Sequence, residues 1–463
     1  MFDSQIYLKR RNELVKSLKD GFILFCGNNE VPMNYQSNYY PFVQDSSFLY
    51  YCGIDFPNLN LLINTYENSA TLYGSNQSVN DIIWCGQSKT LNELAKLAHI
   101  DQISNHNNFQ KDIDLILSQD EILHILPQYR YHNKQILSEI FGGGKWENYI
   151  SADLIKSVIS QRSIKSELEV DEIKNAMVVT KSMHEMAMIN TKFGKTEQEI
   201  VGELMSLVHS TGMRLAYPSI FTVRGEILHN QFYEGILQDG QLLLHDGGVE
   251  SREHYATDIT RTYPVTGRFL LEQRAIYEIV LKMQVDVIRT LSTGVKYRDM
   301  HLLASKICIE GLKSMGIMKG NTEDAIRSGA HALFFPHGLG HMLGLDVHDM
   351  EALGEDNVGY DSEILRDSQF GLSYLRLGKT LQCGNVITVE PGIYFIPALI
   401  DQWEQKGRHK EFVNYSSLNS FRDFGGIRIE DDVLITNDGC DCLSYDIPKN
   451  ISEIEQIMGN DSV

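Results

Sequence analysis

The chain has 463 residues, 43% of them hydrophobic and 22% charged, so it can bury a large core and is long enough for about two or three domains. Its formal net charge of −20, from 41 basic and 61 acidic residues, opposes binding to nucleic acid or to an anionic membrane surface. The seven cysteines are scattered without a CxxC pair, which favours free thiols in a reducing compartment. The N-terminus is charged where a signal peptide needs an apolar run, and no stretch reaches the length of a membrane span. We therefore expect a cytoplasmic protein.

Residues 1–162 are predicted to form an N-terminal α/β domain. Apolar runs bounded by glycine or polar turns, at 21–28, 59–65 and 70–75, predict buried strands. A helix is expected at 6–18, and the alternation of strands with helices indicates the α/β class. Almost nothing in this part of the chain points to chemistry.

Residues 163–463 are predicted to form a second domain, which begins with helices. The first helix has a stripe of apolar side chains that predicts a buried face rather than a cofactor site. This stripe consists of Ile173, Met177, Met183, Met186 and Ile189. Thr196 and Glu199 have the spacing of a capping box that opens a further helix. The later helices are expected at 198–210, 272–291 and 299–315.

Strand-like runs dominate the rest of the chain, at 241–246, 257–266, 385–396 and 426–436. Asp258, Glu390 and Glu430 lie inside such runs, and Asp246 ends the first of them. An ionised carboxylate in a strand interior is costly to bury unless it is paired or bound to a metal. Backbone donors could satisfy one of them, and a turn would explain Asp246 before two glycines. Four together argue for a common ligand.

Histidines are concentrated at residues 331–348. His337 and His341 are four residues apart, as in a zinc HExxH helix, but Gly338 and Gly340 oppose a helix and favour irregular backbone close to a ligand. A single histidine here would more often be a core residue. With His348 following in the same glycine-rich run, a site is the better interpretation.

One histidine and four carboxylates form a ligand set of mainly oxygen atoms. Such a set suits two divalent ions of the Mn²⁺ class better than one structural zinc, with Co²⁺ or Zn²⁺ as alternatives. Two ions about 3.5–4 Å apart can share a hydroxide, which is hydrolytic chemistry at a carbonyl or phosphoryl centre. The remaining histidines could donate hydrogen bonds to a developing oxyanion.

Six motifs carry a family resemblance: YPFVQDSSFLYYCGI at 40–54, and then HDG, TDITRT, HGLGHMLGLDVHD, VEPGIY and GGIRIEDD in that order. In these motifs the sequence resembles the pita-bread metallopeptidases, in particular the proline-specific branch of prolidase and aminopeptidase P. The resemblance covers nearly the whole chain. It implies an α/β N-terminal domain and an α+β pita-bread catalytic domain, with metals in the concave face of a curved antiparallel sheet. It also implies a homodimer.

The resemblance further implies a role for each matching residue. The metal ligands would be Asp246, Asp258, His341, Glu390 and Glu430. Glu390 would also be the general base, and Asp258 and Glu430 would bridge the ions. His337 and His348 would contact the substrate and stabilise the tetrahedral intermediate. His229 would line the proline-side pocket, and Arg428 would orient a ligand.

Two departures from the family pattern stand out. One more residue than usual separates Asp246 from Asp258, and His229 is followed by Asn230 rather than tyrosine.

The substrate expected from this resemblance is an Xaa-Pro dipeptide. The long insert between Glu390 and Glu430 resembles prolidases, as does the stretch YLRLGKTL at 374–381. Arg376 in that stretch would bind the free carboxylate of a dipeptide and so limit substrate length, although a surface role is the plain alternative. An Xaa-Pro aminopeptidase that acts on longer peptides remains open, and so does a non-catalytic peptide-binding module. Creatinase-like hydrolysis is less expected, because that branch works without metals and lacks these carboxylates, whereas all five ligand positions here carry residues that can bind a metal.

Overall fold

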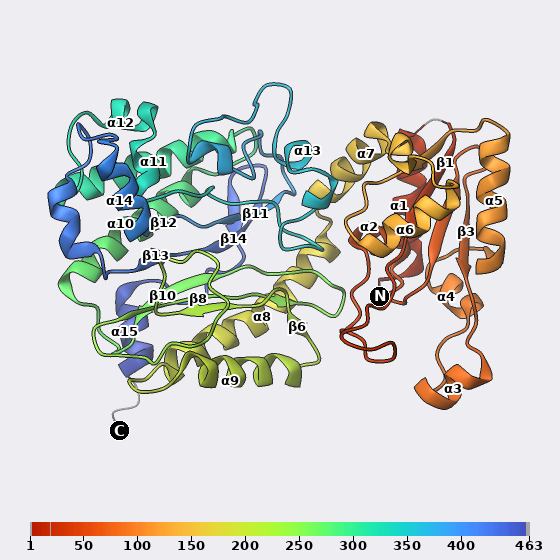
Figure 1. Ribbon diagram of the computed structural model, residues 1–463, viewed down its shortest axis with the longest axis horizontal. Coiled ribbons are helices and arrows are strands. Elements are labelled where there is room, and N and C mark those ends of the chain that lie inside the picture. Colours follow the sequence, from red (N-terminus) through yellow and green to blue (C-terminus); the bar gives the residue numbers. More distant parts are fainter. Residues whose placement is uncertain (1, 19, 460–463) are drawn as a thin grey trace. The chain divides into compact units, whose positions relative to one another are not determined.

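A computed structural model describes residues 2–18 and 20–459 (Figure 1). The chain divides into two compact units. The first comprises Met1–Arg162 together with Met350–Asn357, and the second comprises Ser163–Asp349 and Val358–Val463. Nothing in the sequence had predicted that 350–357 would join the first unit.

The first unit is built on a mixed sheet with strand order β4-β3-β2-β1-β5. Its outer pairs, β3–β4 and β1–β5, are parallel, whereas β1–β2 and β2–β3 are antiparallel. The strands are β1 (Phe22–Cys26), β2 (Asn60–Asn64), β3 (Ser69–Gly74), β4 (Gln102–Asn105) and β5 (Leu123–Ile125). The three strands expected from the apolar runs are therefore confirmed as β1, β2 and β3.

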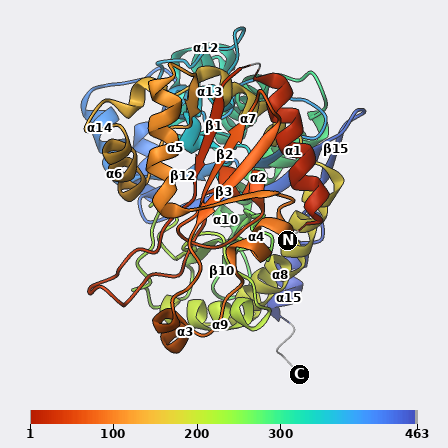
Figure 2. The same ribbon diagram turned by 90° about the vertical axis from the view of Figure 1, so that its right-hand side faces the viewer.

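Both faces of this sheet are covered, because alternate side chains of a strand point to opposite faces. Leu24 and Cys26 pack into one cluster with α5 (His106–Ser118) and α6 (Tyr131–Ile140). Phe25, on the other face, stacks on Tyr51 of α2 (Ser46–Cys52) with ring centroids 4.7 Å apart. Figure 2 shows α1 (Ser4–Ser17) and α5 on opposite sides of the sheet.

The other helices follow in chain order. They are α3 (Val79–Cys85), α4 (Leu91–Leu97), α7 (Ala152–Ser163), α8 (Glu167–Asn190), α9 (Glu197–Ser210), α10 (Leu271–Thr290), α11 (Tyr297–Ser314), α12 (Thr322–Ser328), α13 (Glu355–Gly359), α14 (Pro397–Gln405) and α15 (Ile451–Gly459). Within residues 2–18 and 20–459, none of the helices combines the length and the apolar character needed to span a lipid bilayer.

The predicted capping box at the start of α9 is confirmed. The Thr196 hydroxyl accepts from Glu199 N at 3.2 Å, and the Glu199 carboxylate accepts from Thr196 N at 2.7 Å. The apolar stripe predicted for α8 is only partly correct, because Ile189 is 43% exposed. The polar residues Thr180 and His184 are buried instead. Their burial could not be predicted from the sequence, because a pattern of apolar residues does not identify the polar residues on the same buried face.

The strands of the second unit form small antiparallel sheets, with orders β10-β8-β7, β11-β14-β15, β12-β13 and β6-β9. In Figure 1, α9 lies below β8 and β10 and α10 lies above them. The strands are β6 (Arg214–Leu215), β7 (Ile220–Thr222), β8 (Leu242–Asp246), β9 (Val249–Glu250), β10 (Thr260–Pro264), β11 (Val386–Val389), β12 (Gly392–Tyr394), β13 (Gly426–Arg428), β14 (Asp431–Ile435) and β15 (Cys440–Cys442).

Two runs expected to be single strands are each interrupted. The run 385–396 breaks between β11 and β12 at Glu390 and Pro391, and the run 426–436 breaks between β13 and β14 at Ile429 and Glu430. Pro391 has no N–H to donate to a ladder. Glu390 N donates instead to Leu339 O at 2.8 Å, and Glu430 N donates to Thr260 O at 3.0 Å. Since Val389 pairs with Asp431 and Gly392 with Arg428, this register puts Glu390 directly opposite Glu430.

A buried ion pair closes the turn that carries His348. Lys165 Nζ lies 2.8 Å from Asp349 Oδ2, and both side chains are 1% exposed. The Asp349 carboxylate also accepts from Asp346 N at 3.3 Å.

Replacing Lys165 by Met should lower the free energy of unfolding by about 3–5 kcal/mol, because it leaves a buried carboxylate without this cation. The double variant Lys165→Met/Asp349→Leu should recover much of that loss, since an apolar pair of similar volume avoids the desolvation cost. Urea unfolding of both variants tests this. Equal destabilisation of the single and the double variant would contradict it.

Candidate metal centre

Three of the predicted ligands lie within reach of one ion. Asp258, His341 and Glu430 each offer a ligand atom, and these atoms lie within 4.8 Å of one another. His341 Nε2 is 3.3 Å from Asp258 Oδ2 and 3.9 Å from Glu390 Oε1, so the fourth predicted ligand borders the same space. Asp258, His341 and Glu430 are buried, with exposures of 6%, 3% and 2%.

Asp246 is joined to this group through a tyrosine. The Tyr217 hydroxyl donates to Asp246 Oδ1 at 2.6 Å and is also in hydrogen-bond contact with Asp258 Oδ1. One phenolic proton cannot fully satisfy two carboxylate oxygens. The five predicted ligands are therefore brought together, and Tyr217 by itself does not neutralise the two aspartates.

Local backbone geometry presents these side chains. Asp246 ends β8 opposite Thr260 of β10, and Glu390 and Glu430 occupy the two strand breaks. The segment with His341 is not helical, as its glycines predicted. A Cβ on Gly340 would lie 2.1 Å from Thr388 O, so only glycine lets this segment lie against β11. His341 N donates there to Thr388 Oγ1 at 3.1 Å.

The electrostatics of the site demand cations. Burial raises the pKa of Glu430 well above its ordinary value, and the charges of Asp258, Glu390 and Asp246 raise it further. Burial likewise raises the pKa of Glu390, to about 7. Glu430 Oε1 is buried and has no hydrogen-bond partner among the described residues. An orphaned carboxylate oxygen at the centre of an acidic cluster is the place where a divalent ion fits.

His341 is set up as a nitrogen ligand. Its Nδ1 lies 3.0 Å from the carbonyl of Met342, which can only accept, so Nδ1 carries the proton. Nε2 then faces Asp258 and Glu390, and once deprotonated it could bind a metal held by the same carboxylates. Burial alone would lower the pKa of His341, but the hydrogen bond and charge of Asp258 and the charge of Glu390 raise it to about 9. A bound cation would replace the proton that these carboxylates attract.

Arg428 is the arginine that directly contacts the cluster. Its NH2 donates to Asp246 Oδ2 at 2.6 Å, its NH1 to Tyr394 OH at 2.8 Å and its Nε to Thr260 Oγ1 at 3.1 Å. The Thr260 hydroxyl in turn donates to Glu430 Oε2 at 2.8 Å. One guanidinium thus contacts Asp246 directly and Glu430 through the Thr260 hydroxyl.

The remaining predicted residues lie beside the acidic cluster or act on it electrostatically. His337 Nδ1 is 3.8 Å from Glu390 Oε2, and the His348 ring centroid is 4.2 Å from that of His341. Burial together with the charges of Arg428, His229 and Arg376 lowers the pKa of His337 to about 3. His229 and Arg376 are thus close enough to act on His337 electrostatically, with His229 exposed and Arg376 half-buried.

Three residues that contact the site were not predicted from the sequence: Tyr217, Thr260 and Tyr394. Thr260 and Tyr394 lie inside the motifs TDITRT and VEPGIY, in which only the carboxylates were predicted to be functional. Thr260 is two residues after Asp258, and period-two alternation could have placed both on one face. Tyr217 precedes the first ligand by a long interval and left no signal.

Comparisons with known proteins place the chain among metallopeptidases. Residues 171–437 match metallopeptidase family M24, and residues 7–125 match the aminopeptidase P N-terminal domain. A probable Xaa-Pro aminopeptidase of Fusarium vanettenii is 33% identical over 455 residues, which covers 95% of this chain and 91% of the relative. A probable Xaa-Pro aminopeptidase of Botryotinia fuckeliana is 34% identical over 425 residues, which covers 90% and 88%.

Solved structures extend the likeness to the whole fold. Aminopeptidase P from Escherichia coli with the inhibitor Pro-Leu superposes with a TM-score of 0.81 at 28% identity, covering 99% of each chain. Proline aminopeptidase P II from Yersinia pestis superposes with a TM-score of 0.83 at 27% identity, covering 99% of this chain and all of the other.

The chain therefore belongs to metallopeptidase family M24. These matches confirm the predicted fold class, an N-terminal α/β domain followed by a pita-bread catalytic domain. They do not favour the expected lean to prolidase. The relatives named above are aminopeptidases, so the comparisons support the alternative that the sequence left open.

Replacing Asp258 by Asn should remove metal binding and reduce turnover by more than about 100-fold. Losing an outer partner of a ligand already costs about 10–100-fold, and Asp258 is expected to be a direct ligand. Metal content by elemental analysis and peptidase activity are the readouts, with the exposed Asp438→Asn as the matched control. Unchanged turnover in Asp258→Asn would contradict the assignment.

Proposed function

We propose that this protein is an Xaa-Pro aminopeptidase, which removes the N-terminal residue from peptides with proline in second position. The named relatives support the activity, and the buried acidic cluster supports metal dependence. Proline's tertiary amide has no N–H, so a peptidase that relies on that donor handles it poorly, and a dedicated site is needed. Mn²⁺ as the metal, a homodimer and a cytoplasmic location stay predictions.

The proposed ligands of two divalent ions are Asp246, Asp258, His341, Glu390 and Glu430. The observation that carries this assignment is the buried oxygen of Glu430 without a hydrogen-bond partner, among carboxylates that mutually raise their pKa values. When bound, two such ions supply Lewis acidity and make water nucleophilic at neutral pH.

Glu390 is proposed as the general base. It sits at the break between β11 and β12, where Pro391 and the bond from Glu390 N to Leu339 O fix the backbone. Its two oxygens face His341 and His337 at 3.9 and 3.8 Å, so it lies between the ligand side and the substrate side of the centre. From there it can take a proton from water as the scissile carbonyl is attacked.

The hydrogen bonds around His337 define its role. Its Nδ1 is 2.7 Å from Gly338 O, which only accepts, so in the neutral ring Nε2 is an acceptor. Tyr394 OH, 2.9 Å away, donates to this nitrogen and itself accepts from Arg428. Both nitrogens of His337 are thus occupied, so it forms a fixed wall for the proline together with His229. The donor to the oxyanion is proposed to be His348, whose ring centroid lies 4.2 Å from that of His341.

Arg376 is proposed to attract the carboxyl end of the peptide. Its charge acts on His337, which supports a position near the proposed substrate-side histidines. In a dipeptidase this arginine would limit substrate length, whereas in an aminopeptidase it would contribute only to short substrates.

Substrate length separates the two activities. With Mn²⁺ added, Ala-Pro-Ala should be cleaved with a kcat/KM at least about tenfold above that of Ala-Pro, because contacts beyond the proline stabilise the transition state. A chelator should abolish both reactions, and Ala-Ala-Ala serves as the control without proline. Cleavage of Ala-Pro alone would show a dipeptidase, and Arg376→Met should then raise KM for that substrate. Absence of any cleavage by protein with bound metal would show a peptide-binding module.

A further inference from the structure

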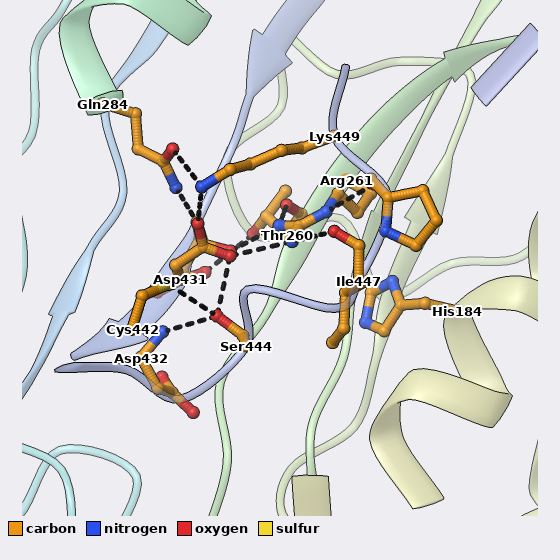
Figure 3. A network of polar contacts seen from close by, with 12 residues as sticks. His184, Thr260, Arg261, Gln284, Asp431, Asp432, Cys442, Ser444, Ile447 and Lys449 are labelled. Atoms are coloured by element: carbon orange, nitrogen blue, oxygen red, sulfur yellow. Dashed lines mark hydrogen bonds and ion pairs between the residues drawn. The ribbon is translucent and has the colours of Figure 1, made fainter. Parts of the chain in front are cut away.

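A second polar cluster lies on the opposite face of the strands that carry the ligands. Period-two alternation points Thr260 and Glu430 to one face and their neighbours Arg261 and Asp431 to the other. Both Arg261 and Asp431 are fully buried, and they pair at 2.8 Å. Figure 3 shows this cluster, which includes Gln284 of α10 and residues of the segment 444–449 that leads to α15.

All donor directions of Arg261 are used. NH1 donates to Glu430 O at 2.6 Å and to Thr260 O at 2.9 Å. NH2 donates to Asp431 Oδ1 at 2.8 Å and to Ile447 O at 3.0 Å, and Nε donates to Pro448 O at 2.9 Å. A guanidinium has five N–H groups in a fixed fork, so this side chain can hold only one position.

Asp431 holds the guanidinium in turn. Its Oδ1 accepts from Ser444 Oγ at 2.7 Å, and its Oδ2 accepts from Gln284 Nε2 at 2.6 Å and from Lys449 Nζ. The side chain of Ile447 packs with Ile259, which lies between the ligand Asp258 and Thr260. The segment 444–449 therefore supports the ligand strands by hydrogen bonds and by apolar packing.

The cluster reaches the metal centre through the backbone. Arg261 joins the carbonyls of Thr260 and Glu430, and Glu430 N donates to Thr260 O at 3.0 Å. These bonds fix the register in which the Thr260 hydroxyl reaches Glu430 Oε2. Glu430 Oε1, the orphaned oxygen, is aimed by the same constraint.

A role in stability alone explains the cluster poorly. A buried ion pair is often no more stabilising than an apolar pair of the same volume, because desolvation offsets the attraction. Here the fully buried pair of Arg261 and Asp431 lies directly behind the ligands, with Lys449 at its edge, where apolar residues could fill the same space. What apolar residues could not do is bind two carbonyls at defined positions.

We propose that Arg261 is a positioning residue of the metal centre, which sets its affinity for divalent ions by holding the backbone of Thr260 and Glu430 from the opposite face. The proposal rests on the metal centre argued above. Arg261 touches neither the metal ligands' side chains nor the substrate pocket, so its effect passes through Glu430.

The test is the affinity for Mn²⁺ of the full-length protein, measured by competition with a chromophoric chelator. Arg261→Lys keeps the charge but loses the fork, and it should weaken Mn²⁺ binding by about 10–100-fold. Activity should fall at limiting Mn²⁺ and recover at saturating Mn²⁺. Leu312→Ala, a truncation at a fully buried position of α11, is the control for general loss of stability. It should lower Tm without changing the affinity.

Wild-type affinity in Arg261→Lys, with a loss of Tm like that of the control, would overturn the proposal. If Arg261→Lys does not fold, Lys449→Met provides a milder test, because Lys449 lies at the edge of the cluster and is 17% exposed. It should weaken Mn²⁺ binding several-fold, and an unchanged affinity would again overturn the proposal. Failure of the wild-type protein to bind any divalent ion would instead contradict the metal centre itself.

Discussion

Glu390 and Glu430 lie opposite each other between the antiparallel strand pairs β11–β14 and β12–β13, and the repulsion between their carboxylates is a constraint that the surrounding structure must accommodate. Like charges opposite one another destabilise a sheet, and burial makes their desolvation more costly. The strands interrupt at these two residues, and both backbone N–H groups bond to other segments. With Asp246, Asp258 and Asp432 also buried nearby, the excess of negative charge is the property that a pair of divalent ions would compensate.

Two arginines hold this charge in place from opposite faces. Arg428 lies on the ligand side, where its fork serves Asp246, Thr260 and Tyr394, and through Tyr394 it fixes the tautomer of His337. Arg261 lies behind, where its fork serves carbonyls. Thr260 is the point where the two systems meet, since its hydroxyl binds Arg428 and Glu430 while its carbonyl binds Arg261. The proposed metal ligands and the proposed substrate-side residues are thereby linked through one residue of β10.

The sequence could single out most of the proposed ligands because they break a local rule: a carboxylate in an apolar run, or a histidine among glycines. The interruptions of the strands could not be predicted from sequence. The period of the apolar pattern indicates which face of a sheet a residue points to, but not which residue it pairs with. Pro391 could be read from the sequence, but whether it would interrupt the strand depended on the hydrogen-bond partner of Glu390 N. Tyr217 was invisible for a related reason: a tyrosine after a short strand is ordinary, and its hydroxyl acquires meaning only when two distant aspartates meet around it.

The expectation of a prolidase shows that the identity of one residue, Arg376, does not determine which substrate length the site accepts. Arg376 lies in a stretch that resembles prolidases, but this resemblance does not predict the conformation of the loop around Arg376. In the structure Arg366 donates to Ser373 O at 2.8 Å and to Leu375 O at 3.0 Å, and Tyr360 OH donates to Leu375 O at 2.8 Å. The backbone just before Arg376 is therefore firmly held. A fixed arginine attracts the carboxylate of any peptide short enough to reach it, and a longer peptide is excluded only if the loop also blocks its path. Substrate length is thus a property of the loop's shape rather than of the arginine.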